Sequence, residues 1–118
     1  MTGIEGEAIA ADYLIKHGYK LVERNFRCSI GEIDLVAWEG ETLVFVEVKA
    51  RSSSRFGDPA GAVTPQKQEK INRVALVYLQ QKKLLTSLCR FDVVAIVKEG
   101  RGVAITLFQN AFEGRLSL

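Results

Sequence analysis

The first apolar pattern along the chain has the period of an α-helix. At about 100° per residue, five residues fall on one stripe: Ile4, Ala8, Ala11, Leu14 and Ile15. Thr2 and Glu5 have the spacing of a capping box, and Gly18 follows at the far end. These signals predict a helix from Ile4 to His17, with His17 at its C-terminal cap.

Three β-prone runs follow this helix, at Tyr19–Arg27, Glu32–Trp38 and Thr42–Lys49. The first has the weakest alternation, which favours a place at the edge of a sheet. A short turn separates the other two, so they are expected to form a hairpin.

The second half of the chain contains another helix and two more strands. Thr64 and Pro65 are an N-cap and a proline at the first helical position. The helix is expected to run to residues 81–83, with Ile71, Val74, Ala75 and Tyr78 as its core stripe and Lys67 on the same stripe. Strands are expected at Arg90–Val97 and Val103–Phe108, before a tail at 109–118 docked by Phe112. Residues 50–63 have no periodicity and are expected to form a long, mobile loop.

This order predicts one α/β domain over residues 1–118, a mixed β-sheet flanked by helices. The second helix can serve as a crossover between parallel strands. No run approaches the roughly 18 apolar residues of a membrane span, and a cytoplasmic protein is expected. With one histidine and two cysteines, Cys28 and Cys89, a structural zinc site is not expected. Any metal should be a hard, oxygen-bound ion such as Mg²⁺ or Mn²⁺.

The net charge of +2 conceals a division along the chain. Residues 1–48 carry 4 basic and 9 acidic groups, whereas residues 49–73 carry 6 basic and 2 acidic groups. An acidic cluster facing a basic segment suits a metal-assisted enzyme that acts on a polyanion. Scattered, solvated charges are the alternative explanation.

Two carboxylates and a lysine stand out in the predicted hairpin. Strand residues alternate between faces, so Glu47 and Lys49 point one way while Val44, Val46 and Val48 point into a dry layer. A two-residue turn of Glu39 and Gly40 sets Asp34 diagonal to Glu47, and a four-residue turn from Glu39 to Thr42 sets them directly opposite each other. Like charges so close destabilise a sheet, so a positive group should lie between them, either Lys49 or a divalent cation.

Glu7 lies at the edge of the first helix's stripe, partly turned toward the interior. A buried carboxylate is costly without a partner. A side chain that simply reaches solvent is the alternative.

The motifs that carry these residues resemble a known family. They are Gly6-Glu7, Asn25-Phe26-Arg27, Gly31-Glu32-Ile33-Asp34, Phe45-Val46-Glu47-Val48-Lys49 with Arg51, and Arg90-Phe91-Asp92-Val93. In this order and spacing they are similar to the bacterial YraN family, over nearly the whole chain. Asp34 and Glu47-Val48-Lys49 also resemble the PD-(D/E)xK nuclease superfamily, and Glu7 matches the extra acid of its Holliday-junction-resolvase-like branch. Ile33 stands where that superfamily's name has a proline.

The resemblance implies a restriction-endonuclease-like fold and a nuclease that cuts DNA, including branched or damaged DNA. It implies that Asp34, Glu47 and the Val48 carbonyl ligate Mg²⁺ or Mn²⁺, with Glu7 reaching the ion directly or through water. Lys49 would orient or deprotonate the attacking water, or stabilise the transition state. The junction-cutting relatives act as dimers, so a homodimer is an expectation by analogy.

Four residues are candidate contacts to nucleic acid: Arg51, Arg55, Gln66 and Lys67. For Arg51 and Arg55 the alternative is an exposed loop charge. Asp92 and Arg90 share a strand face and are interpreted as a structural ion pair. Two other functions stay open, namely nucleic-acid binding without cleavage, and an interaction module in which Asp34, Glu47 and Lys49 form a salt-bridge cluster.

Overall fold

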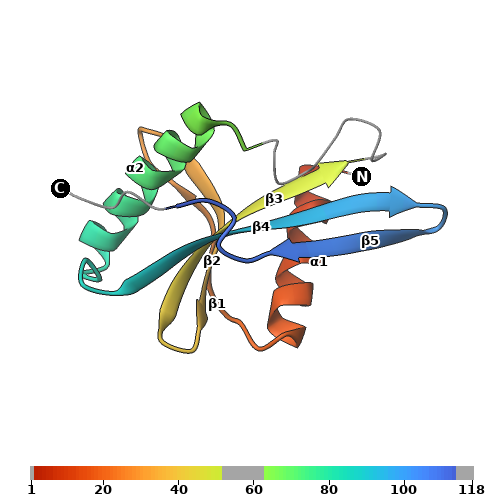
Figure 1. Ribbon diagram of the computed structural model, residues 1–118, viewed down its shortest axis with the longest axis horizontal. Helices are drawn as coiled ribbons and strands as arrows, with labels where there is room; N and C mark the ends of the chain where they lie inside the picture. The colour runs from red at the N-terminus through yellow and green to blue at the C-terminus, as the bar shows by residue number, and fades with distance from the viewer. Residues whose placement is uncertain (1, 52–62, 114–118) are drawn as a thin grey trace.

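The computed structural model describes residues 2–51 and 63–113 and confirms the predicted order of elements. The elements are α1 (Gly3–Lys16), β1 (Lys20–Arg27), β2 (Glu32–Glu39), β3 (Thr42–Arg51), α2 (Pro65–Gln81), β4 (Leu88–Glu99) and β5 (Gly102–Phe108) (Figure 1). The chain is therefore an α/β protein. The largest difference from expectation is β4, which extends two residues beyond Arg90–Val97 at each end.

The strands form one mixed sheet in the order β1-β2-β3-β4-β5. All neighbours are antiparallel except β3 and β4, which are parallel and are joined through α2. The crossover and the edge position of β1 are both confirmed. Because β3 lies between β2 and β4, its side chains occupy the centre of the sheet.

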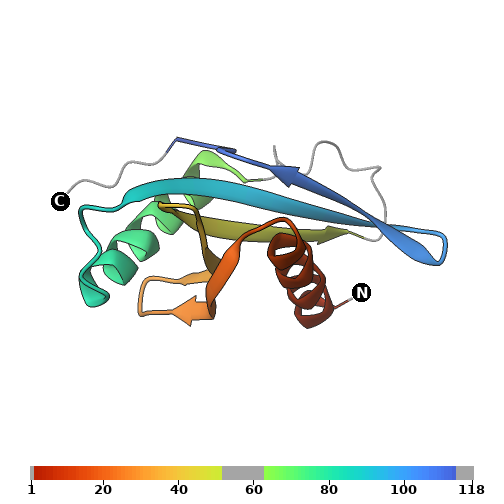
Figure 2. The ribbon, with the colours of Figure 1, turned by 90° about the horizontal axis from the view of Figure 1, so that it is seen from below.

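The two helices cover opposite faces of the sheet. Phe45 of β3 belongs to the buried cluster under α2 and meets the Tyr78 ring edge-on, with centroids 5.8 Å apart. Its neighbours Val44 and Val46 belong to the cluster under α1. Successive strand residues point to opposite faces, so α1 and α2 enclose the sheet between them. Figure 2 shows the two helices near different ends of the twisted sheet.

The buried face of α1 differs from the predicted stripe. Ala11 and Leu14 are buried as expected, but Ile4 is 81% exposed and Ile15 is 50% exposed. Ala8 is exposed as well. The residues that pack on the sheet are Gly6, Ala10, Ala11 and Leu14. Small residues let the helix backbone approach the sheet, and this close fit outweighed the larger apolar area of the isoleucines.

The ends of α1 follow the predicted signals. The Thr2 hydroxyl accepts a hydrogen bond from the Glu5 N–H at 3.1 Å, as an N-cap does. His17 is the C-cap, and its ring Nδ1 lies 2.8 Å from the Tyr13 carbonyl. Gly18 follows with a φ of 89°, a conformation that glycine adopts without strain.

Helix α2 begins as predicted, with the Thr64 hydroxyl accepting from the Lys67 N–H at 3.2 Å. Its predicted core stripe is confirmed, since Ile71, Val74, Ala75 and Tyr78 are all buried. The placement of Lys67 on that stripe was wrong, because its side chain is exposed. The first turn of α2 extends past the apolar core and leaves Lys67 over the polar end of β3.

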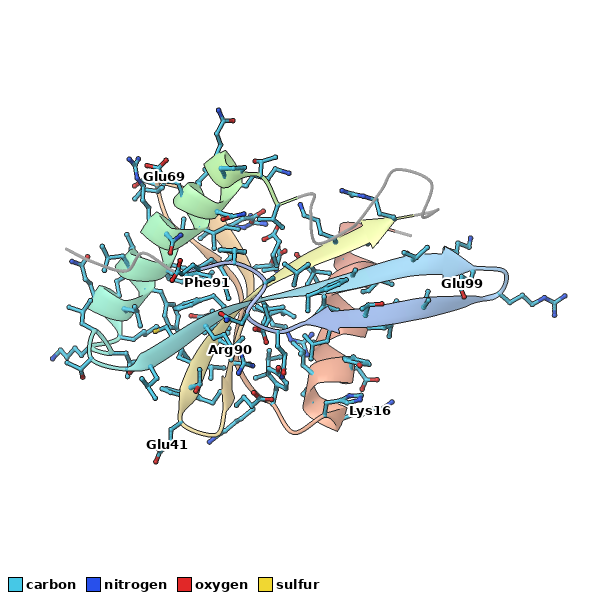
Figure 3. All side chains as sticks on the ribbon, in the orientation of Figure 1. Lys16, Glu41, Glu69, Arg90, Phe91 and Glu99 are labelled. Atoms are coloured by element: carbon cyan, nitrogen blue, oxygen red, sulfur yellow. The ribbon has the colours of Figure 1, made fainter. Side chains whose placement is uncertain are left out.

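A buried polar network at the start of β4 confirms the predicted ion pair of Arg90 and Asp92. Asp92 is fully buried and receives hydrogen bonds from the Arg90 guanidinium at 2.8 and 3.0 Å, the Tyr19 hydroxyl at 2.9 Å and the Asn110 N–H at 2.9 Å. Burial raises the pKa of Tyr19 to about 12. Arg90 lies near the middle of the molecule (Figure 3). These contacts join β1, β4 and the chain after β5, which is a structural role.

Phe112 is buried and stacks on Phe91, with ring centroids 4.9 Å apart, so the predicted docking of the tail is confirmed for this residue. Of the expected loop at 50–63, Ala50 and Arg51 belong to β3 and Val63 is buried. The rest of that loop, including Arg55, lies outside the described residues. No helix in the described ranges is long and apolar enough to cross a membrane.

Candidate functional site

The β2–β3 hairpin has the register that sets the two acids opposite each other. Trp38 pairs with Leu43 and Leu35 pairs with Val46. This is the register predicted for the longer turn, although Glu39 and Thr42 also pair and leave only two residues at the bend. Extended by one position, it places Asp34 opposite Glu47.

The β2–β3 ladder ends just before the two acids. Its last pair is Leu35 with Val46, whereas β3 continues beside β4 as far as Arg51. Val48 therefore has no strand partner on the β2 side. Its N–H instead donates a hydrogen bond of 2.8 Å to a carboxylate oxygen of Asp34. In a strand the N–H and C=O of one residue point toward the same neighbour, so the Val48 carbonyl also faces the Asp34 side.

Asp34 is a strongly perturbed acid. Burial, followed by the charge of Glu47, raises the pKa of the Asp34 carboxyl from 3.8 to about 7. The Val48 N–H opposes this rise, and the charge of Glu7 adds to it. No ion pair within 4 Å reaches Asp34 from the residues that the structure describes. No described lysine or arginine therefore neutralises the charge of the Asp34 carboxylate.

Glu7 comes to this site because α1 lies close to β3. A Cβ on Gly6 would lie 2.9 Å from the Cβ of Ala50, so only glycine allows this separation without a shift. Glu7 is half-buried and, at 100° per residue, lies on the same side as Ala11 and Leu14. The sequence pattern placed it at the edge of the helix face, but the true buried face includes it. Its orientation is thus toward the sheet, where its charge acts on Asp34.

A cluster of positive charge lies beside the acids. Lys49 is 8% exposed, and its ammonium lies 3.4 Å from a carboxylate oxygen of Glu47. The pKa of Lys67 is lowered, first by the positive charge of Lys49 and to a lesser extent by Arg51. Lys67 reaches this cluster from the first turn of α2. The positive charges of Lys49, Arg51 and Lys67 therefore lie close together, next to the three carboxylates described above.

Asp34, Glu47 and Lys67 border one pocket of about 690 Å³. It is lined by Arg27, Cys28, Gly31, Glu32, Asp34, Glu47, Lys67, Lys70 and Ile71. The volume is in the range of small-ligand sites. Of the predicted site residues, Asp34, Glu47 and Lys67 line the pocket directly, and Lys49 joins it through its ion pair with Glu47.

Of the predicted contacts that the structure describes, Arg51 and Gln66 do not line this pocket. Gln66 lines a neighbouring hollow, together with Ile30 and Lys70. Arg55 lies outside the described residues. In contrast, the structure adds the turn between β1 and β2, which the sequence reasoning did not connect to the site. The sequence signal that could have found it is the position of Gly31 and Glu32 shortly before Asp34, and the structure pairs Glu32 with Arg27 across the turn.

The oxygen donors at this place suit a hard cation. Among the described residues, no three His, Cys, Asp or Glu side chains form a ready-made metal cluster. Mg²⁺ needs no such cage, because it keeps several waters and binds through one or two carboxylates. Asp34 and Glu47 could supply that number of carboxylates, the Val48 carbonyl faces the same side, and the charge of Glu7 acts on Asp34.

Comparison with known proteins agrees with the motifs. The model of the uncharacterised protein family UPF0102 matches residues 6–96. A UPF0102 protein of Syntrophus aciditrophicus is 49% identical over 112 residues, which cover 95% of this chain and 88% of the relative. A UPF0102 protein of Geobacter metallireducens is 49% identical over 111 residues, covering 94% and 91%. One from Caldicellulosiruptor saccharolyticus is 45% identical over 112 residues, covering 93% and 95%. The chain therefore belongs to the UPF0102 family, also called the YraN family, as the motifs predicted.

Proposed function

We propose that this protein is a metal-dependent phosphodiesterase that hydrolyses DNA. The observation that carries the proposal is a pocket in which Asp34 lies beside Glu47 without an ion-pair partner among the described residues, while the cations Lys49 and Lys67 crowd each other next to it. The carboxylates of Asp34, Glu47 and Glu7 repel one another, and the cations Lys49 and Lys67 do the same. A divalent cation relieves the first repulsion and a phosphate relieves the second.

The acids have the chemistry to hold the cation. Asp34 and Glu47 would bind Mg²⁺ or Mn²⁺ with the Val48 carbonyl, and Glu7 would act through a water. When bound, such an ion polarises a phosphate oxygen and makes a coordinated water more acidic. A bound cation would favour the charged carboxylate, so the pKa of Asp34 is expected to be raised in the metal-free protein and lowered when the ion binds.

Lys49 is placed to act on the reacting phosphate. It is nearly buried, it is held at Glu47, and it lies on the same face of β3 as that acid. Its ammonium would stabilise the charge that develops on the phosphate oxygens, where low solvent access strengthens the interaction. The alternative role, deprotonation of the attacking water, uses the same position.

Nucleic acid is the polyanion that best suits the surrounding cations. Arg51 at the end of β3 and Lys67 on α2 lie on the side of the pocket next to Lys49. Both are exposed, so they are available to a large substrate. Arg55 and Gln66 remain predicted contacts. A cytoplasmic location belongs to the same proposal, and the free thiols of Cys28 and Cys89 are consistent with it. The homodimer remains a prediction by analogy.

The salt-bridge alternative has one observation in its favour, the ion pair of Lys49 with Glu47. That pair does not include Asp34, which lacks an ion-pair partner among the described residues while its pKa is raised to about 7. A site selected only for stability would neutralise its most buried acid.

The test is incubation of the protein with linear, nicked and branched DNA and with RNA, in the presence of Mn²⁺ or Mg²⁺. Asp34→Asn is expected to abolish cleavage, and Asp12→Asn, an exposed change on α1, is the matched control. Binding that survives Asp34→Asn, with no cleavage of any substrate by the unaltered protein, would favour the alternative of binding without catalysis.

A further inference from the structure

A second hollow lies next to the pocket of Asp34 and Glu47. It has a volume of about 330 Å³ and is lined by Ile30, Gln66, Glu69, Lys70 and Arg73. Lys70 lines both hollows, so the two meet at this side chain. In each hollow one wall is α2 and the other is the turn between β1 and β2, and the two hollows, which lie on either side of Lys70, are together called the groove.

Lys70 and Lys67 differ from the two arginines of this groove because no ion pair holds either lysine within the described part of the chain. Arg73 lies 3.2 Å from Glu69, which Figure 3 labels on the first half of α2. Arg27 lies 3.0 Å from Glu32. Lys70 and Lys67 are therefore the groove cations with charge left for a ligand, and they are adjacent on α2.

A glycine across the groove determines where Lys70 lies. A Cβ on Gly31 would be 2.9 Å from Cε of Lys70 and 3.4 Å from Cγ2 of Val74. Cε carries the ammonium, so the lysine stem lies directly on the backbone of the turn. The φ of Gly31 is outside the left-handed region, so a side chain at this position would disturb the close approach of Lys70 and not the backbone conformation.

We propose that Lys70, positioned by Gly31, binds a second phosphate of a nucleic-acid strand that leaves the acidic centre along this groove. The inference rests on the proposed function and specifies its substrate as a strand with a further phosphate beyond the one at Asp34. Ile30 is 39% exposed at the same hollow and offers an apolar contact to a sugar or base. A free phosphate or a mononucleotide would not use both hollows.

The first part of the test is equilibrium binding of labelled single-stranded and duplex oligonucleotides, with EDTA present and over a series of salt concentrations. Lys70→Ala is expected to weaken binding about five- to tenfold and to reduce the salt slope by about 0.7–0.9, the value for one phosphate contact. Lys82→Ala is the matched control, because Lys82 lies at the far end of α2 and pairs with Glu23 at 3.8 Å. Its affinity and slope should equal those of the unaltered protein.

The second part uses Gly31→Ala, whose methyl group must displace the flexible end of Lys70. This variant should fold normally and lose about as much affinity as Lys70→Ala. In a Lys70→Ala background the same change should have no further effect on affinity, since the obstructing stem is gone.

Unaltered affinity of Lys70→Ala would overturn the inference, and so would an equal effect of Gly31→Ala in both backgrounds. Displacement of the oligonucleotide by inorganic tripolyphosphate at equal phosphate concentration would overturn it too, by showing a general polyphosphate site. Lys70-dependent binding without cleavage would support the inference while refuting the proposed catalysis, so the two failures are distinguishable.

Discussion

The backbone N–H of Val48 donates a hydrogen bond of 2.8 Å to the Asp34 carboxylate. Val48 lies two residues after Val46, the last residue of β3 that pairs with β2. This contact fixes Asp34 beside Glu47, although burial and the charge of Glu47 oppose ionisation there. The hydrogen bond therefore holds the Asp34 carboxyl group at a position where its negative charge is unfavourable. Under the proposed function, a bound cation would compensate for this cost.

Asp34→Asn is expected to stabilise the metal-free protein at pH 8. The folded pKa of about 7 exceeds the ordinary 3.8, so the folded state binds more protons than the unfolded state between these values. The stability of the unaltered protein therefore falls as pH rises from about 4 to 7, and the asparagine removes that loss while still accepting from Val48. We expect a gain of about 1–2 kcal/mol at pH 8, measured by chemical denaturation.

At about pH 3 the same substitution should change stability little, because Asp34 is then protonated in the folded state and, below its ordinary pKa of 3.8, largely so in the unfolded state. Asp12→Asn is the control on an exposed acid, which pairs with Lys16 at 2.9 Å. A destabilised Asp34→Asn at pH 8 would contradict the reasoning.

Binding of Mn²⁺ should release a proton from the site. Asp34 is mostly protonated at pH 6, since its pKa is about 7, and a metal ligand must be ionised. Titration calorimetry in two buffers of different ionisation enthalpy should show release of about one proton per ion at pH 6 and much less at pH 8. Equal release at the two pH values would exclude Asp34 as the ligand that titrates.

Lys49→Met is expected to reduce cleavage by about 10²-fold or more while Mn²⁺ binding is retained, because Lys49 acts on the phosphate and not on the ion. Lys67→Met, an exposed neighbour, should lower substrate affinity more than turnover. If Lys49→Met instead lowers the melting temperature strongly, and Mn²⁺ alters the stability of neither protein, the salt-bridge module becomes the better explanation.

Arg51→Ala is expected to weaken DNA binding and to reduce the salt slope by about 0.7–0.9, as for the loss of one phosphate contact. Arg51 is exposed and close enough to Lys67 to affect its pKa. Arg101→Ala, at the exposed turn between β4 and β5, is the control. The measurement is oligonucleotide affinity over a salt series, and an unchanged slope would remove Arg51 from the contact surface.

Asp92→Ala should destabilise the protein by about 3 kcal/mol, since it leaves Arg90 without the buried carboxylate that binds it. Urea denaturation measures this loss. Mn²⁺ binding by the folded variant should be unchanged, because Asp92 belongs to the structural network and not to the pocket. Loss of Mn²⁺ binding from a variant shown to be folded would contradict that division.

The order of helices and strands and the starts of both helices could be derived from the sequence alone, and the hairpin register was limited to two alternatives. These features depend on local signals, such as the Thr64-Pro65 start of α2 and the alternation that separates Glu47 and Lys49 from Val48. The same alternation predicted that Asp34 and Glu47 share a face. Such patterns repeat along the backbone, so no knowledge of distant neighbours is needed to interpret them.

Only the tertiary structure decided how far the helices are rotated and which charges meet. The face of α1 depends on how closely Gly6 can approach Ala50, and the isoleucines of that helix gave the wrong orientation. The raised pKa of Asp34 and the placement of Lys70 against Gly31 likewise arise between segments far apart in the chain. Burial, steric fit and charge interactions depend on distances in space, and those distances are set by packing rather than by any periodic pattern.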